Sequence, residues 1–401
     1  MTKIALDTFF KGVKGANFKV QYWDGSEEAY GEELPRATIL FRQEPPSDFH
    51  VENDAVLAFG EAYMDGWIDF SGAIDELVYM VKSNKEHFIN ASRVGKALSL
   101  VHSLLHIRGA DTRWQQKQNI QHHYDLGNDF FSLWLDPTFC YSCAYFAKPD
   151  LSLHEAQLMK VDYILKKLDL HPGERLLDIG SGWGWLITRA AEQYGVKALG
   201  ITLSKEQYKG TQDRINKMKL NDKVEVRLMN YLDLDEKNDC FDKIVSVGMF
   251  EHVGKQFLRR YMEKVNQLLV DGGLSLLHSI TTSKELSPQA SWAQKYIFPG
   301  GYVPSLRETI WMLPEYDLNL IHVESFRLHY AKTLECWYAN FSEHVDEVRK
   351  KFGERFVRMW SLYLRGSAAY FRTGNLDIHQ LLFTKGVNNQ LPMTFSHLHF
   401  G

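Results

Sequence analysis

The sequence has few of the features that define several large protein classes. Its 401 residues contain four cysteines, which is too few for a disulfide scaffold. It contains no run of about 18 apolar residues, so we expect no membrane-spanning helix, and its first residues lack the apolar segment of a signal peptide. The formal net charge of -4 argues against a dedicated nucleic-acid-binding protein. These absences favour a cytoplasmic protein.

The chain is rich in residues that build a core. Hydrophobic residues make up 45% of it, which is ample for tight packing. Its length predicts one large and one small domain, because domains usually hold about 100–200 residues. Aromatic residues reach 13%; large cores explain most of this content, and an apolar substrate would explain the rest.

The most informative stretch is the glycine-rich segment Gly180–Gly184. It follows the apolar run 176–179 and precedes the amphipathic run 186–194, the order of a strand, a tight turn and a helix. Glycines let the backbone come close to a ligand at the helix N-terminus. The spacing is G-x-G-x-G, unlike the G-x-G-x-x-G of dinucleotide-binding loops, and the next strand ends in Thr202 where those enzymes have a ribose-binding acid. The segment resembles the S-adenosylmethionine (SAM) loop of class I methyltransferases; an ordinary tight turn is the alternative.

Strand and helix patterns alternate after residue 150, which predicts an α/β protein with a doubly wound, seven-stranded, Rossmann-like sheet. Helices are expected at 152–168, 186–194, 204–218 and 261–269, with Ser204 as an N-cap. Strands are expected at 175–179, 196–202, 224–229, 241–247 and 274–280. Two late helices within 331–372 and edge strands at 320–328 and 377–383 would complete the fold.

The first 85 residues form a separate block, expected to be a smaller α+β domain. Strand-like runs at 18–23 and 37–41 precede a helical pattern from 56 to 81. Within that pattern Phe59, Tyr63, Trp67 and Phe70 recur at helical spacing and read as a core stripe. Residues 86–115 are expected to be a linker with local basic charge, and residues 116–401 the catalytic domain, with an aromatic-rich insertion near 281–313.

Ligands of open α/β sheets bind outside the carboxyl ends of the strands. The residues expected there include several that are polar or ionisable, which makes a binding site more plausible than a chance grouping of loops: Asp178, Gly180, Thr202, Asn230, Tyr231, Gly248, Met249, Glu251, His252 and His278.

Several segments together resemble one family, the cyclopropane fatty acid synthases. They are QHHYDLGN (121–128), YSCAY (141–145), LDIGSGWG (177–184), GITLSKEQ (200–207), MFEHVG (249–254) and KYIFPG (295–300). The segment GEAYMDGW (60–67) is similar to the N-terminal domain of the longer, phospholipid-acting members. The resemblance covers nearly the whole chain, and the combination is far more specific than any single motif.

The resemblance implies a reaction in which the SAM methyl group is transferred to a cis double bond of a phospholipid acyl chain. A carbocation forms, the new methyl group loses a proton, and a cyclopropane ring closes. Family members hold a bicarbonate ion as the base. By motif match its holders would be Cys143, Glu251, His278, the backbone of Ile280, and Tyr338.

Each of these residues also has an ordinary structural reading. Cys143 lies in a C-x-x-C pair with Cys140, yet no second ligand pair with zinc spacing follows, so a buried structural cysteine is the main alternative. Glu251 would otherwise cap a helix, and His278 would be a hydrogen-bonded core histidine. Tyr338 would be a packing residue. Glu251 must be protonated or screened from the bound anion, because two unpaired anions side by side are costly.

The same motif match implies the SAM-contacting residues. Tyr141 and Ser142 correspond to a cofactor-contacting pair, and the loop contributes Asp178, Gly180, Ser181 and Gly182. Thr202, Leu203 and Gln207 would reach the ribose and methionine parts, and Asn230 and Tyr231 would flank the adenine. Mycobacterial members carry a Trp near this last position, where this chain has Tyr231. Some members carry a Cys in the segment that reads Gly366–Ala369 here, so that thiol is not needed for the chemistry.

The implied substrate requires contact with a membrane. The insertion, the late helices and the N-terminal block are candidates for the acyl channel and for docking at the inner face of the membrane. The basic run Arg349–Lys351, with Arg355 and Arg358, would touch anionic headgroups or form a solvated helix face. A homodimer is compatible with the resemblance. The competing hypotheses are a lipid C-methyltransferase that leaves a methyl branch or exocyclic methylene, a non-catalytic lipid-binding protein, and a methyltransferase of soluble small molecules.

Overall fold

A computed structural model describes residues 1–84, 87–88, 126–283 and 291–398. All of the expected linker 86–115 except residues 87–88 lies outside these residues, as do most of the 121–128 motif and part of the expected insertion. The described chain forms two compact units. The first comprises the N-terminal residues through Phe88, the segment 291–299 and Trp337–Asn375; the second comprises 126–283, 300–336 and 376–398.

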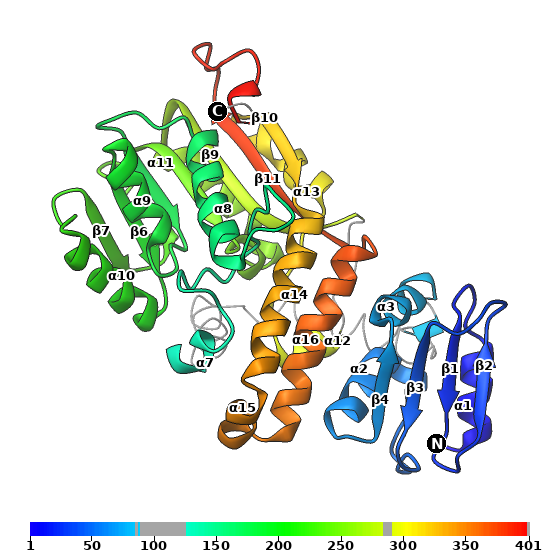
Figure 1. Cartoon of the computed structure of the whole chain (residues 1–401). Coiled ribbons are helices and arrows are strands. Elements are labelled where there is room, and N and C mark those ends of the chain that lie inside the picture. The colour runs from blue at the N-terminus through cyan, green and yellow to red at the C-terminus, as the bar shows by residue number, and fades with distance from the viewer. Residues whose placement is uncertain (85–86, 89–125, 284–290, 399–401) are drawn as a thin grey trace. The chain divides into compact units, whose positions relative to one another are not determined.

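The first unit begins with a small α+β arrangement, drawn in blue in Figure 1. Its four-stranded sheet has the order β2-β1-β3-β4. The elements follow the chain as α1 (Lys3–Lys11), β1 (Phe18–Gln21), β2 (Glu27–Tyr30), β3 (Ala37–Phe41), α2 (Val51–Met64), β4 (Ile68–Gly72) and α3 (Ile74–Ser83). Alternate residues of β1 and β3 are buried, which is the pattern of strands with one face on a core.

The single helix expected over 56–81 is wrong, because β4 interrupts it. Gly66 and Gly72 adopt positive φ angles of 80° and 83° at either end of the strand, and Ile68 pairs with Phe41 of β3. Helical spacing of aromatic residues was therefore coincidental beyond Tyr63. The core interpretation is confirmed, since Phe59, Tyr63, Trp67 and Phe70 all belong to one hydrophobic cluster.

Two later segments complete the first unit. They contain α12 (Ser291–Tyr296), the C-terminal part of α14 (Arg327–Glu343), α15 (Val345–Phe352) and α16 (Glu354–Arg372). Trp292 lies against Gly60 of α2, and the Lys295 ammonium donates to Glu61 at 2.6 Å. Arg358 of α16 donates to Asp69 at 2.8 Å and lies over the ring of Tyr63. The boundaries of the two compact units along the chain therefore differ from the boundaries expected at residues 85 and 115.

The second unit is built on a seven-stranded sheet, as predicted, and its strand order is β10-β11-β9-β8-β5-β6-β7. Its strands are β5 (Arg175–Ile179), β6 (Lys197–Thr202), β7 (Val224–Leu228), β8 (Phe241–Val247), β9 (Leu269–Thr282), β10 (Leu318–Ser325) and β11 (Leu376–Lys385). Strands β5 to β9 pair in parallel, and β10 and β11 are antiparallel to their neighbours. Helices are α7 (Asn128–Ser132), α8 (Leu153–Lys167), α9 (Trp185–Tyr194), α10 (Lys205–Met218), α11 (Leu258–Leu268), α13 (Leu306–Met312) and the N-terminal part of α14.

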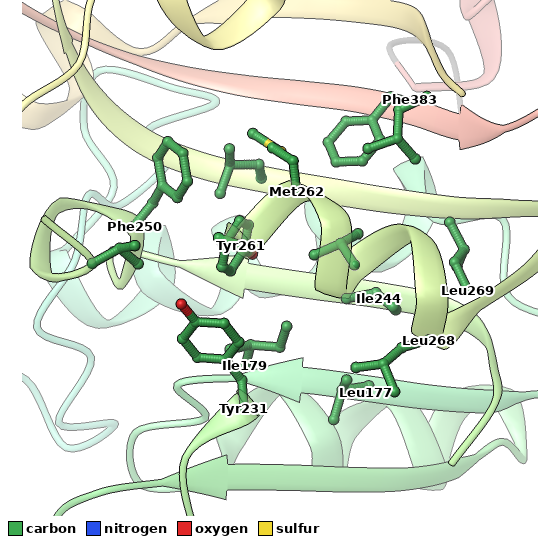
Figure 2. Close-up of a cluster of buried hydrophobic side chains, with 14 of the residues drawn as sticks. Leu177, Ile179, Tyr231, Ile244, Phe250, Tyr261, Met262, Leu268, Leu269 and Phe383 are labelled. Atoms are coloured by element: carbon green, nitrogen blue, oxygen red, sulfur yellow. The ribbon is translucent and has the colours of Figure 1, made fainter. Parts of the chain in front are cut away.

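Hydrophobic residues cover both faces of this sheet. Helices α8, α9 and α10 contribute to one cluster, with Leu176 and Val245 of the strands. Helix α11 and the short helix η4 (Leu313–Tyr316) contribute to the other, with Leu177 and Ile244. Figure 2 shows the second cluster, in which side chains of α11 lie over β5 and β8. Because adjacent strand residues point to opposite faces, near-continuous apolar runs are what a doubly covered sheet requires.

Local signals set several element ends as predicted. Ser204 is the N-cap of α10 and accepts from the Gln207 backbone nitrogen, and Ser152 forms a capping box with Glu155 at the start of α8. Other expectations need correction. Strand β11 lies between β9 and β10 instead of at an edge, and β10 ends at Ser325 because α14 begins at Arg327. The late helical region holds α14, α15 and α16 where two helices were expected.

Among the helices that the structure describes, none combines the length and apolar character needed to cross a membrane.

Candidate active site

A cavity lies at the carboxyl ends of β5, β6 and β8 in the second unit. Besides these strand ends, it is lined by the segment before α8 and by the short helix η1 (Tyr231–Asp233). All the residues that the motif match assigned to the cofactor line this one cavity: Tyr141, Ser142, Asp178, Gly180, Ser181, Gly182, Thr202, Leu203, Gln207, Asn230 and Tyr231. Their proposed contacts with a cofactor stay a prediction.

The glycine segment turns the chain from β5 into α9 with three left-handed residues. Gly180, Gly182 and Gly184 have φ angles of 89°, 55° and 78°. A Cβ atom on Gly184 would collide with the Thr211 side chain of α10, so the close approach of the two helices requires glycine there. The backbone nitrogens of Gly180 and Ser181 both donate to the carbonyl of Ile201 at 3.0 Å, which fixes the loop against β6.

Two buried polar atoms of the cavity wall fit a polar ligand. Within the described chain, Asp178 Oδ1 and Ser181 Oγ have no hydrogen-bond partner. Burial raises the pKa of Asp178 to about 7, and the nearby Lys160 ammonium opposes that shift. Leaving such atoms unsatisfied is costly, and a ligand with hydrogen-bond donors or positive charge would relieve the cost. The donor-rich amino acid part of SAM has this character.

The remaining wall is held by its own hydrogen bonds. Thr202 Oγ1 donates to Gln207 Oε1 at 2.7 Å and accepts from the Ser204 backbone nitrogen, which fixes the end of β6. Asn230 Oδ1 accepts from Leu232 and so shapes η1. The Tyr231 ring packs edge-on against Tyr261 of α11, with 5.4 Å between the ring centroids. Both residues are labelled in Figure 2. Residues beyond the expected set also line the cavity.

Lys160 is the most informative residue that the sequence reasoning missed. It lies on α8, is 3% exposed, and donates to Ser142 Oγ at 3.0 Å. Gln157, one turn earlier, donates to the carbonyls of Cys140 and Ser142. The two side chains therefore hold the 140–142 segment at the cavity. The available signal was their place on the apolar face of a predicted helix, where an unexplained lysine calls for a partner.

His252 also lines the cavity. Burial lowers its pKa to about 4, so it is a neutral imidazole near neutral pH. The sequence placed it at a strand end but gave it no role.

A second group of buried polar residues lies beside β8 and β9. Glu251 belongs to the short helix η2 (Phe250–His252) after β8 and is 8% exposed. Its Oε1 accepts from the backbone nitrogen of Ile280 at 2.6 Å, so these two residues, both assigned to the base site by the motif match, are in contact. Its Oε2 is buried without a hydrogen-bond partner among the described residues. Burial raises the pKa of Glu251 to about 7, and the Ile280 hydrogen bond opposes this.

His278 is fully buried in β9, two residues before Ile280. Its Nδ1 lies 3.0 Å from Gln380 Nε2, while its Nε2 has no partner within the residues that the structure describes. Burial and the charge of Lys160 and Lys167 hold the pKa of His278 well below its ordinary value. His278 is thus buried, as expected for a core histidine, and one of its ring nitrogens is still available to bind a ligand.

Cys143 is fully buried, and its Sγ donates to the carbonyl of Ala144 at 3.2 Å. Burial raises its pKa, so it is a neutral thiol and a poor nucleophile. A weaker contact of 3.9 Å reaches the carbonyl of Phe326, whose ring centroid is 5.8 Å from that of His278. Phe326 therefore connects Cys143 to His278.

Four of the five predicted base-site residues lie in the second unit, Glu251 in contact with Ile280 and Cys143 connected through Phe326 to His278. None of the four lines the cofactor cavity. Tyr338 lies on α14 beyond the unit boundary, in the first unit, so its place in this group stays a prediction.

Two family models match the chain. The model of the mycolic acid cyclopropane synthetase family matches residues 111–381, and the model of a domain of unknown function, DUF7884, matches residues 5–93. The cyclopropane-fatty-acyl-phospholipid synthase of Escherichia coli is 37% identical over 372 residues, which cover 89% of this chain and 93% of that protein. A probable fatty acid methyltransferase of Pseudomonas putida is 36% identical, with 94% of each chain covered.

Solved structures agree with these matches. The cyclopropane synthase MmaA2 from Mycobacterium tuberculosis has a TM-score of 0.63 and 36% identity, covering 67% of this chain and 98% of that one. The mycolic acid cyclopropane synthase CmaA1, solved with SAH and CTAB, gives the same values. Coclaurine N-methyltransferase, at 18% identity and a TM-score of 0.62, shares the fold alone. The predicted class I SAM-dependent methyltransferase fold is confirmed.

Proposed function

The chain belongs to the mycolic acid cyclopropane synthetase family, and on this basis we propose that it is a SAM-dependent cyclopropane-fatty-acyl-phospholipid synthase. It converts the cis double bond of a membrane phospholipid acyl chain into a cyclopropane ring. One observation carries the proposal. A glycine-loop cavity fit for a cofactor lies beside a buried group of polar residues, in which Glu251 Oε2 and His278 Nε2 have no partner in the described structure.

Bound SAM supplies an electrophilic methyl group. The chain's part in the transfer is to bind and orient, since an alkene has no proton to be removed before attack. Asp178 and Ser181 offer their unsatisfied oxygens to the polar part of the cofactor. The glycines of this segment have no Cβ atom and adopt positive φ angles, so a cofactor can approach their backbone closely. The transfer also requires a site that excludes water, which would otherwise capture the acyl carbocation.

Ring closure needs a base for the proton of the new methyl group, and bound bicarbonate supplies one in our proposal. The donor set fits this ion. Glu251 Oε2 accepts from a hydroxyl, and His278 Nε2, when protonated, donates to an oxygen. Burial keeps His278 and Cys143 uncharged beside the ion. Ile280 fixes Glu251, and Tyr338 is a further proposed holder.

A phospholipid is the substrate that the comparisons favour. The Escherichia coli relative is named for that substrate, and the match extends over 93% of its length. We propose action from the cytoplasm at the inner face of the membrane. The basic run at 349–358 is a weak candidate for headgroup contact, because Arg349, Arg355 and Arg358 each pair with a carboxylate within the first unit. The insertion and the N-terminal block stay candidates for the acyl channel and for membrane docking. A homodimer stays a prediction.

A second candidate is a lipid C-methyltransferase that leaves a methyl branch or an exocyclic methylene. It shares the fold and the cofactor, and the Pseudomonas putida relative is named a probable fatty acid methyltransferase. The ring and the exocyclic methylene both require loss of a proton from the new methyl group, so the buried group around Glu251 serves either product; the name of the Escherichia coli relative supports the ring. A non-catalytic lipid-binding protein has no need for the complete Gly180–Gly184 loop.

The test is mass spectrometry of acyl chains. The full chain is mixed with methyl-labelled SAM and vesicles of a cis-monounsaturated phospholipid, in parallel with the corresponding free fatty acid. A gain of one labelled methylene with loss of the alkene, in the phospholipid sample, supports the proposal. Labelling of the free acid alone would identify a free fatty acid, and not a phospholipid, as the substrate. A labelled product that keeps its double bond supports the second candidate.

A further inference from the structure

Three side chains of the second unit form a row across neighbouring antiparallel strands. His278 of β9 is the register partner of Gln380 of β11, and Gln380 is in turn the partner of Glu324 of β10. Residues directly opposite each other in antiparallel strands project from the same face of a sheet. Lys167 of α8 contacts this row, and its ammonium donates to Gln380 Oε1 at 2.8 Å and to Glu324 Oε2 at 2.6 Å.

The lysine determines which way the glutamine amide points. An ammonium group has three donors and no acceptor, so the amide atom that faces Lys167 must be the oxygen. The amide nitrogen therefore faces His278 Nδ1, at 3.0 Å. That nitrogen can only donate, so Nδ1 must accept. A neutral imidazole that accepts at Nδ1 carries its proton on Nε2.

This chain of contacts ends at the ring nitrogen that is buried without a partner in the described structure, His278 Nε2. We infer that Lys167 and Gln380 are positioning residues that hold His278 in its Nε2–H tautomer, so that it offers a hydrogen-bond donor to an anion at the base site. The inference rests on the proposed function for the nature of that anion. The tautomer itself follows from the contacts of the resting protein alone.

The surroundings of Lys167 explain how a charge is kept inside the fold. Its side chain is fully buried, and the Glu324 carboxylate, which also accepts from Tyr163 at 2.8 Å, compensates the charge. A buried lysine paired with a partly exposed carboxylate is less stabilising than apolar packing at the same place. The presence of Lys167 here therefore indicates a role other than stability. Without Lys167 the Gln380 amide could rotate and present its oxygen to His278. The imidazole proton would then move to Nδ1, and a lone pair would face the anion.

The first test reads the tautomer directly. The full chain is produced with histidine labelled at both ring nitrogens with nitrogen-15, and the His278 signals among the 16 histidines are assigned by their loss in His278→Asn. We expect a protonated Nε2 and an unprotonated Nδ1. Lys167→Met should give a mixture of the two tautomers. Lys264→Met is the matched control, because Lys264 is also buried and paired, with Glu236 and the carbonyl of Leu234, and should leave the His278 signals unchanged.

Gln380→Glu is the sharper variant. The new carboxylate can accept from Lys167 with one oxygen and from His278 with the other, so His278 should carry a proton on Nδ1. The other charged or titratable groups near His278 are Lys160 and Lys167 of α8 and His379 of β11, and Gln380→Glu leaves all three unchanged. A wild-type His278 protonated on Nδ1, or a Gln380→Glu spectrum identical to the wild type, would overturn the inference. If Gln380→Glu does not fold, the Lys167→Met spectrum decides.

Activity supplies a second and separable readout. Gln380→Glu should raise the bicarbonate concentration for half-maximal ring formation by at least about tenfold, the effect of losing one hydrogen bond to a charged group. SAM affinity should stay unchanged, because Gln380 does not line the cofactor cavity. A wild-type enzyme indifferent to bicarbonate would refute the proposed base and leave the tautomer result standing. An unchanged bicarbonate requirement in Gln380→Glu, with the tautomer reversed, would refute the positioning role.

Discussion

Glu251 Oε1 accepts a hydrogen bond from the backbone nitrogen of Ile280 at 2.6 Å, which joins the turn after β8 to the end of β9. The same carboxyl group keeps its second oxygen buried and without a partner among the described residues. One oxygen therefore orients the group, and the other is left for chemistry. A carboxyl group whose pKa lies at about 7 is suited to share a proton with a bound base near neutral pH.

Glu251→Gln should separate these two roles. The glutamine carbonyl can still accept from the Ile280 backbone nitrogen, but an amide nitrogen, which can only donate, replaces the acceptor Oε2. We expect ring formation to fall by about 10²–10⁴, the usual effect of losing a group that takes part in proton transfer. SAM affinity should not change, since Glu251 does not line the cofactor cavity. Glu263→Gln, at an exposed position of α11, is the control. Wild-type turnover in Glu251→Gln would show that the base site is elsewhere.

Asp178 makes the stability of the ligand-free protein depend on pH. Burial raises its pKa from 3.8 to about 7, so the folded protein binds a proton that the unfolded chain has lost. This contribution to stability is complete below the unfolded pKa and is lost as pH rises toward the folded value. Asp178→Asn should therefore reduce the fall in unfolding free energy between about pH 5 and pH 8, by about 3 kcal/mol at most. Denaturant unfolding at both pH values measures it. Asp213→Asn, on the surface of α10, should keep the wild-type slope; an equal slope in Asp178→Asn would contradict the account.

Gly184→Ala tests the approach of α9 to α10. The added methyl group meets Thr211 and also forces a left-handed backbone on alanine. Gly195→Ala, at the other end of α9, imposes a similar φ of 69° without a collision and away from the cavity. We expect Gly195→Ala to cost about 1–2 kcal/mol with SAM affinity intact. Gly184→Ala should cost more and weaken SAM binding by at least about tenfold, measured by calorimetry. Equal SAM affinity in the two variants would argue against this role of the loop.

Gly60→Ala tests whether the segment 291–299 belongs to the first unit. Its methyl group would displace the Trp292 side chain that lies against α2. Faster hydrogen exchange of peptides covering 291–299 is the expected result, read by mass spectrometry. Gly366→Ala is the matched control, because this helical glycine of α16 has open space around its Cβ position. That change should stabilise its helix by about 1 kcal/mol. Unchanged exchange in Gly60→Ala would place Trp292 elsewhere.

The sequence predicted the second unit well because its signals are local. An apolar run, a glycine turn and a capped helix each announce themselves within a few residues, as Ser204 and Gly184 illustrate. It failed at β4, where pairing of Ile68 with Phe41 overrides an aromatic pattern of helical spacing. It also misplaced β11, because the order of antiparallel strands depends on contacts between residues far apart in the chain.

The cofactor residues could be named by motif, but the residues that support them could not. Lys160 acts through Ser142, 18 residues earlier in the chain, and Lys167 acts through Gln380, 213 residues later. A buried lysine on an apolar helix face is the signal that sequence offers. Its partner becomes known only when the sheet is assembled.

The deuterium content of the new carbon tests the central claim most directly. The full chain is given SAM with a fully deuterated methyl group and a cis-monounsaturated phospholipid, and the acyl product is examined by NMR and mass spectrometry. The account predicts a cyclopropane methylene that keeps two of the three deuterons, the third having been removed at the base site. A methyl branch with all three deuterons, or a chain with its double bond intact, would contradict it.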